Sequence, residues 1–241
     1  METKTNTKNE KPLGQRAYGS IPHLPGSRRG PSDKGLSDQQ ARILTDKTRD
    51  KFDVITVQEK LDGSNVAVAN INGEIVALIR AGYRATESNF EQHHHFARWV
   101  DNQLPRFEKL LKEGERVSGE WLMEAHGTRY DLPHEPFVAF DIMAGHERAL
   151  ASVVRERCDV VDFITPRLIH IGGAFSIEEM LKVLESSGHG ALDPVEGAVW
   201  RAERNGVVDF LGKYVRSDKV DGKYLSGVSG GDPVYNWLPP W

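Results

Sequence analysis

The amino-acid sequence predicts an α+β domain in which antiparallel sheets are flanked by helices. Segments rich in β-branched residues outnumber segments with helical periodicity. Asn72-Gly73 stands between two of these segments, and this dipeptide is the strongest short signal for a β-hairpin. Hydrophobic residues make up 39% and charged residues 27% of the 241 residues, a balance that is ordinary for a globular chain able to bury a core.

The N-terminal residues 1–35 are predicted to form a basic, Gly- and Pro-rich arm in front of a body that spans residues 36–241. Residues 1–51 hold eleven Lys and Arg against six Asp and Glu, although the whole chain has a net charge of −4. Such an arm could touch phosphates, but for residues 1–12 the composition favours a solvated, partly disordered tail. Residues 13–35 also contain large side chains that could pack: Tyr18, Ile21, His23 and Leu24. We therefore expect an ordered lead-in that lies over the body.

The body begins with a short helix, for which Ser37 is a suitable N-cap. Helical periodicity also runs from Thr86 to Leu111, where Pro105 should divide it into two helices. Strands are expected over residues 52–58, 65–71, 74–80, 115–123, 136–143, 195–201 and 207–216. Further helices are expected over residues 147–158 and 176–187, and a loop with three aromatic residues over residues 230–241.

The helical segment contains three consecutive histidines, His93, His94 and His95. A zinc site needs ligands that converge on one point, whereas consecutive residues of a helix point in different directions. The pattern therefore favours exposed or capping histidines over a metal site.

Lys60 is the residue around which a chemical function can be built. It follows an apolar strand and precedes a tight Asp62-Gly63 turn. A lysine becomes a nucleophile when burial or nearby positive charge lowers the pKa of its amine. Attack on the phosphorus of a nucleotide would give a phosphoramidate and expel pyrophosphate, with a metal and cationic side chains around the phosphates. Arg80 and Lys213 are candidates for the cations; the candidates for holding the ribose or a metal-bound water are Glu120, Asp141 and Glu196.

Six motifs in a fixed order resemble those of the covalent nucleotidyltransferases, the family of polynucleotide ligases and messenger-RNA capping enzymes. They extend over roughly residues 53–216, and they are Lys60-Leu61-Asp62-Gly63-Ser64-Asn65, Arg80, Gly119-Glu120, Phe140-Asp141, Glu196-Gly197-Ala198-Val199-Trp200-Arg201 and Lys213. Taken singly, Phe140 could be a core residue and Asp62-Gly63 a simple turn. Agreement of all six in order is the stronger observation.

Within this family the chain is most similar to ATP-dependent RNA ligases of the phage RNA ligase 2 type, which Glu59 and Asn65 fit best. The resemblance implies a nucleotidyltransferase (ATP-grasp-like) domain in which Lys60 takes up AMP beside Leu61. Glu59 would lie at the adenine edge and Phe140 would stack on the adenine. The resemblance also implies that Asn65 and Arg80 contact the ribose or the phosphates and that Glu120 contacts the ribose. Glu196, with Asp141, would orient a metal-bound water, and Lys213 would hold the α-phosphate.

Two departures from the family pattern stand out. The last motif usually carries two lysines one residue apart, whereas here Lys213 is alone in that register, and Lys219 or Lys223 would have to substitute. Only 28 residues follow Lys213. We therefore expect no C-terminal OB-fold or helical clamp domain, with the lead-in, a partner protein or an oligomer taking its place.

The sequence thus predicts an ATP-dependent RNA ligase that uses Mg²⁺ (or Mn²⁺), forms lysyl-AMP and seals 5′-phosphate to 3′-hydroxyl ends of RNA, or of DNA. A DNA ligase and a capping guanylyltransferase are the alternatives within the family. A protein that binds nucleic-acid ends without joining them is the alternative outside it. The single cysteine, Cys158, allows no internal disulfide, and no apolar run is long enough for a membrane or a signal peptide, so we expect a cytoplasmic location.

Overall fold

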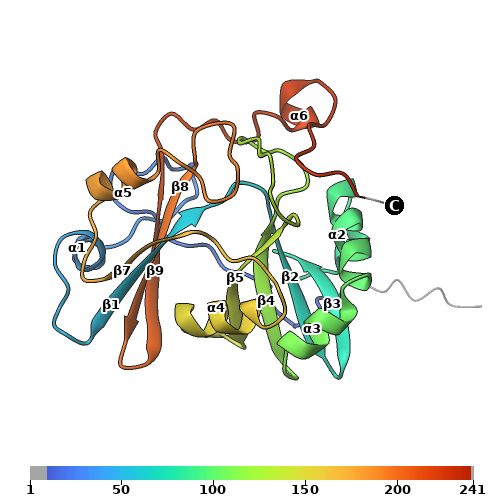
Figure 1. The fold of residues 1–241 in the computed structure, drawn as a ribbon, viewed down its shortest axis with the longest axis horizontal. Helices are drawn as coiled ribbons and strands as arrows, with labels where there is room; N and C mark the ends of the chain where they lie inside the picture. Colours follow the sequence, from blue (N-terminus) through green and yellow to red (C-terminus); the bar gives the residue numbers. More distant parts are fainter. Residues whose placement is uncertain (1–9, 240–241) are drawn as a thin grey trace, which may run out of the picture.

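Two antiparallel sheets form the framework of the molecule in a computed structural model that describes residues 10–239 (Figure 1). One sheet has four strands in the order β7-β1-β8-β9, and the other has five in the order β3-β2-β4-β5-β6. This arrangement confirms the predicted α+β class with antiparallel sheets flanked by helices. No helix within residues 10–239 is long and apolar enough to cross a membrane.

The strands are β1 (Asp53–Lys60), β2 (Ser64–Ile71), β3 (Glu74–Ile79), β4 (Glu115–Trp121), β5 (Phe137–Ala144), β6 (Glu147–Arg148), β7 (Leu168–Gly172), β8 (Gly197–Arg204) and β9 (Val207–Val215). The helices are α1 (Asp38–Thr45), α2 (Glu91–Asp101), α3 (Leu104–Leu110), α4 (Ala151–Asp159), α5 (Ile177–Val183) and α6 (Ser226–Ser229), with a 3₁₀ turn η1 (Ala85–Glu87).

Each sheet has its own hydrophobic core beneath its own helices. Helices α1 and α5 lie against the four-stranded sheet, and α2 and α3 lie beside the five-stranded sheet (Figure 1). Ile55 and Val57 of β1 belong to the first core, and Phe96 and Trp99 of α2 belong to the second. Because successive side chains of a strand point to opposite faces, Lys60 lies on the other face of β1, away from the core that contains Ile55 and Val57.

The element boundaries follow local chemistry. Ser37 caps α1 with a capping box, as predicted. The long helical segment is divided as predicted, but α2 ends at Asp101 and Pro105 lies in the first turn of α3, where its missing N–H costs nothing. The expected helix over residues 147–158 begins only at Ala151, because residues 147–148 pair with β5 as β6. Helix α5 ends at Val183, before Gly188.

Strand β7 was not predicted from the sequence. It is a five-residue edge strand that pairs with β1, and most of its side chains are only partly buried. Its short run Leu168-Ile169-His170-Ile171 gives a weak pattern, and its position is fixed by pairing with a partner more than a hundred residues away.

The N-terminal lead-in, residues 13–35, packs on both sheets. Ala17, Tyr18 and Leu24 are buried. The N–H of Ala17 donates to the carbonyl of Arg80, and the N–H of Leu24 donates to the carbonyl of Lys213. At the other end of the chain, Trp237 packs against Trp121 in the core of the five-stranded sheet. Residues 1–9 of the predicted arm and Trp241 lie outside the described residues.

Candidate functional site

A cavity of about 600 Å³ lies between the two sheets, and Lys60 at the end of β1 is part of its wall. This volume falls within the range of small-molecule sites. Eight of the residues predicted for the nucleotide site line it: Glu59, Lys60, Leu61, Asn65, Arg80, Glu120, Phe140 and Lys213. They come from strands or strand ends of both sheets, so the pairing of the sheets assembles a site whose members are dispersed between residues 59 and 213.

The Lys60 amine forms an ion pair with Glu196, at 2.5 Å between Nζ and Oε2. Strand pairing places them together, because Lys60 is opposite Gly197, the residue after Glu196. Burial alone would lower the pKa of Lys60, but the negative charges of Glu196, Glu120 and Asp62 outweigh burial and raise the pKa above its ordinary value. The amine is therefore protonated at neutral pH, and burial alone does not make it a nucleophile. It becomes one only when the surrounding carboxylate charge is neutralised.

Glu120 stands on β4 directly opposite Asn65 of β2. Its carboxylate accepts a hydrogen bond of 3.0 Å from the N–H of Gly63 in the turn after Lys60. Burial raises the pKa of Glu120 to about 7, although Lys60 and the Gly63 N–H oppose this effect. Oδ1 of Asn65 is buried without a hydrogen-bond partner among the described residues. A buried acceptor without a partner is costly, and a ligand hydroxyl could satisfy it.

Gly63 is required at this turn by packing. A Cβ atom at this position would lie 2.4 Å from the carbonyl oxygen of Trp121. The turn can therefore approach β4 closely enough for Gly63 to reach Glu120 only without a side chain.

The two predicted phosphate cations lie on opposite sheets and are joined by the lead-in. Arg80 is exposed, and its guanidinium donates to the carbonyl of Gly19 and to the hydroxyl of Ser20. Lys213 on β9 is hydrogen-bonded through its backbone to Pro22 and Leu24. Burial and the nearby charge of Lys60 lower the pKa of Lys213. Lead-in residues that also line the cavity, and that sequence reasoning did not identify as site residues, are Arg16, Tyr18, Gly19, Ser20 and Ile21.

Phe140 faces the cavity, whereas its neighbour Asp141 does not line it. The ring of Tyr18 meets Phe140 edge-on at 5.0 Å between centroids, which holds the aromatic wall in place. Asp141 is fully buried, and its oxygens pair with Arg148, Arg201 and the Tyr18 hydroxyl. This geometry argues against the predicted metal role of Asp141, because both oxygens already serve a structural ion-pair network.

Glu59 lies beside the cavity, but its carboxylate is directed away from it. The Ser187 hydroxyl donates to Oε1 at 2.6 Å, and the Gly188 N–H donates to Oε2 at 2.8 Å. Each carboxylate oxygen thus accepts one hydrogen bond from the segment after α5, which fixes the orientation of the Glu59 side chain. The contact of Glu59 with the adenine edge stays a prediction.

The consecutive histidines do not form a metal site, and the described residues contain no group of three or more His, Cys, Asp or Glu that could hold a metal ion. Nε2 of His93 is 2.7 Å from the Ser64 hydroxyl, and Nδ1 is 2.6 Å from the Ser88 hydroxyl. Burial lowers the pKa of His93 to about 4, so the ring is neutral. His93 and His126 both line the cavity, and neither was predicted to do so.

The groups around Lys60 nevertheless fit a divalent cation that is carried by a substrate. Glu196, Glu120 and Asp62 place three carboxyl groups near the Lys60 amine. Carboxylate oxygens suit Mg²⁺ and Mn²⁺, which take several further ligands from phosphates and water. Glu196 and Glu120 are the residues that would hold such an ion.

Comparisons with known proteins show a family match and similar folds. The sequence model of the RNA ligase family matches residues 53–215, and no curated protein matches the chain. An archaeal ATP-dependent RNA ligase superposes with a TM-score of 0.53 and 21% identity, over 83% of this chain and 48% of that chain. A Naegleria gruberi RNA ligase with PPi superposes with a TM-score of 0.51 and 17% identity, over 68% of this chain and 50% of that one. A lysine-to-alanine mutant of that ligase with ATP and Mn superposes with a TM-score of 0.52 and 15% identity, over 80% of this chain and 59% of that chain.

The chain therefore spans about half the length of the first two of these solved structures. At these identities, the likeness establishes the fold.

Proposed function

The chain belongs to the RNA ligase family, and from this premise we propose that it is an ATP-dependent polynucleotide ligase that joins RNA ends through a lysyl-AMP intermediate on Lys60. The observation that carries this proposal is the position of Lys60 and Glu120 in the wall of a cavity that is large enough for a nucleotide, with Glu196, which does not itself line the cavity, paired to the Lys60 amine. The family match covers the segment that supplies these three residues.

In the first step, Lys60 loses one proton from its ammonium group, and Glu196 is the base within reach of that proton. The neutral amine then forms an N–P bond to the α-phosphorus of ATP. The bond from this phosphorus to the bridging oxygen of the β-phosphate breaks, and pyrophosphate leaves. A bound Mg²⁺ or Mn²⁺ would supply charge neutralisation at the phosphates. Arg80 and Lys213 stand on either side to hold the phosphate oxygens.

In the next steps, a 5′-phosphate oxygen of RNA attacks the same phosphorus, the N–P bond breaks and Lys60 regains its proton. A 3′-hydroxyl then attacks the activated 5′-phosphate, a phosphodiester forms and AMP leaves. Phe140 offers an aromatic face for the adenine, and the unpartnered Oδ1 of Asn65 offers an acceptor for a sugar hydroxyl.

The substrate is proposed as RNA ends, with the exposed Arg80 and Arg16 at the cavity providing charge for a terminal phosphate. The lone Cys158 is buried, which suits a cytoplasmic site of action. A partner protein or a second copy could add surface for the nucleic acid.

Covalent labelling tests this function. The protein is incubated with Mg²⁺ and α-labelled ATP or GTP and then run on a denaturing gel. Label from ATP that Lys60→Ala abolishes supports the proposal, and label from GTP alone would instead indicate a guanylyltransferase. Sealing of nicked and single-stranded RNA, compared with the same DNA substrates, then distinguishes an RNA ligase from a DNA ligase. A protein that labels with neither nucleotide but retains RNA ends would be a binding protein.

A further inference from the structure

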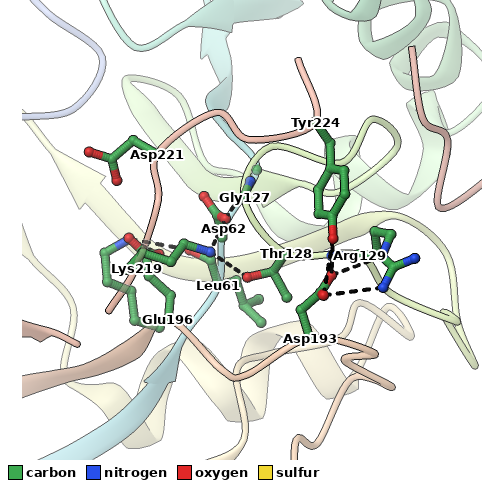
Figure 2. Close-up of polar contacts among 12 residues, drawn as sticks. Leu61, Asp62, Gly127, Thr128, Arg129, Asp193, Glu196, Lys219, Asp221 and Tyr224 are labelled. Atoms are coloured by element: carbon green, nitrogen blue, oxygen red, sulfur yellow. Dashed lines mark hydrogen bonds and ion pairs between the residues drawn. The ribbon is translucent and has the colours of Figure 1, made fainter. Parts of the chain in front are cut away.

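The segment that follows β9 lies across the turn that carries Lys60. We call residues 216–225 the C-terminal strap. It begins beside Glu196, where the N–H of Arg216 donates to the carbonyl of Glu196 at 2.9 Å. It ends at the loop after β4, where the N–H of Tyr224 donates to the carbonyl of His126 at 2.7 Å and the Tyr224 hydroxyl contacts Asp193. Figure 2 shows the strap arching over Asp62 and Thr128 between these two ends.

Lys219 is the residue through which the strap reaches the nucleophile turn (Figure 2). Only 8% of Lys219 is exposed, and its ammonium forms an ion pair with Asp62 and a hydrogen bond with the buried Thr128 hydroxyl. A lysine is rarely buried to this extent, and its charge needs such partners. The Lys219 amine is consequently not available as a phosphate ligand in the cavity.

Asp62 is held from three sides. Besides Lys219, its Oδ2 accepts a hydrogen bond of 2.8 Å from the N–H of Gly127, and its own N–H donates to the Tyr130 hydroxyl at 3.1 Å. Asp62 is two residues from Lys60, and the N–H of the next residue, Gly63, donates to Glu120, so Asp62 lies within the turn that fixes the end of β1. The partner that orients this carboxylate therefore helps to fix the turn that follows the nucleophile.

The three segments meet without spare room. A Cβ atom at Gly127 would lie 2.4 Å from the carbonyl oxygen of Val220, 2.9 Å from Cε of Lys219 and 3.0 Å from Oδ2 of Asp62. The strap is therefore packed against the turn rather than loosely draped over it. Lys223 provides a contrast, because it is exposed and its amine lies over the ring of Tyr224, at 4.8 Å from the centroid.

We propose that Lys219 is a positioning residue, which through Asp62 fixes the turn after Lys60 and so holds the nucleophile in line with the α-phosphate. This inference rests on the proposed function, because it concerns the rate of lysyl-AMP formation. It also assigns a role to the C-terminal strap. The strap supports the turn after Lys60 from the side away from the cavity, and Lys219 does not contact the nucleotide.

The test compares Lys219→Met with Lys223→Met, which removes an exposed lysine of the same strap. Single-turnover labelling with α-labelled ATP is measured over a range of ATP concentrations. We expect Lys219→Met to lower the rate at saturating ATP by about tenfold or more, since small displacements of a reacting group are costly. The half-saturating ATP concentration should change by less than about threefold, since ground-state binding is not affected. Lys223→Met should label like the wild type.

The variant Asp62→Asn/Lys219→Met removes both buried charges and so leaves neither unpaired, which keeps the test valid if Lys219→Met does not fold. If Lys219 acts through Asp62, the double variant labels no more slowly than Asp62→Asn alone. A Lys219→Met protein that is folded and labels at the wild-type rate would overturn the inference. It would also be overturned if the fold-decrease in labelling rate of the double variant equalled the product of the fold-decreases of the two single variants. A rise confined to the half-saturating ATP concentration would also overturn it, since it would make Lys219 a nucleotide ligand. Failure of the wild type to label with ATP would instead refute the proposed function.

Discussion

Replacing Asp141 separates a structural role of this carboxylate from a catalytic one. Its side chain is fully buried, and those of its partners Arg148 and Arg201 are 18% and 4% exposed. Removing the carboxylate in Asp141→Ala leaves these two guanidinium groups in the interior without their counter-ion. Loss of one partner of a buried pair costs about 3–5 kcal/mol. The Tyr18 hydroxyl, 3.0 Å from Asp141, also loses its acceptor.

For a chain of this size, about 1 kcal/mol corresponds to roughly 2–4 °C in Tm. We therefore expect Asp141→Ala to lower Tm by roughly 6–20 °C, as followed by circular dichroism, and to retain Mg²⁺-dependent labelling at temperatures where it is folded. The matched control is Asp221→Ala, because Asp221 is 71% exposed and pairs with Arg28 at the surface. The control should change stability by less than about 1 kcal/mol. An Asp141→Ala protein with unchanged Tm that has lost Mg²⁺-dependent labelling would refute this reasoning and restore the metal role.

Three further predictions concern pH, the aromatic wall and the nucleophile turn. Burial lowers the pKa of His93 and His189 to about 4. As the pH falls from about 6.5 to 4, these histidines take up protons in the unfolded chain but stay neutral in the folded one. The free energy of unfolding therefore has its full value above about pH 6.5 and decreases toward pH 4, by on the order of 2–3 kcal/mol for each histidine. Tm measured from neutral to acidic pH should fall through this window, and a constant Tm would contradict it. Tyr18→Ala removes the ring that supports Phe140 and should raise the half-saturating ATP concentration in labelling by about tenfold with a smaller change in the saturated rate; an unchanged concentration would show that Phe140 needs no support. Gly63→Ala should displace the turn from Trp121 and lower labelling by about 100-fold in a folded protein, and near wild-type labelling would count against the tight turn.

The sequence predicts many of the residues that line the cavity because strand ends and turns carry local signals. The Asp62-Gly63 turn, the Asn72-Gly73 hairpin and the order of the later motifs place Lys60, Arg80, Glu120 and Lys213 at related positions, and the cavity brings them together. The predicted strands agree with the structure to within two or three residues at most ends.

Side-chain direction and long-range partners could not be read in the same way. The alternation of residues along β1 does not reveal that Ser187 and Gly188 donate hydrogen bonds to the Glu59 carboxylate, because they lie on a loop that is distant in the sequence. The aromatic-Asp motif likewise places Asp141 beside the site, while its orientation depends on Arg148 and Arg201.

Lys219 illustrates the same limit more sharply. The sequence shows that a second lysine is lacking beside Lys213, and it offers Lys219 and Lys223 as equal candidates. Only the folded strap distinguishes them, because it buries Lys219 against Asp62 and leaves Lys223 at the surface. No local signal in the sequence favours Lys219, because the Asp62 turn becomes its neighbour only in the folded chain.

Direct mapping of the adenylyl group tests the central claim of this account. The protein is incubated with ATP and Mg²⁺, digested, and the peptide that contains Lys60 is examined by mass spectrometry beside the same peptide from Lys60→Arg. We predict one AMP bound to Lys60 through an acid-labile phosphoramidate bond, and none in the variant. AMP on another residue, or an unmodified Lys60 peptide from a protein that joins RNA ends, would contradict the assignment of Lys60 as the nucleophile.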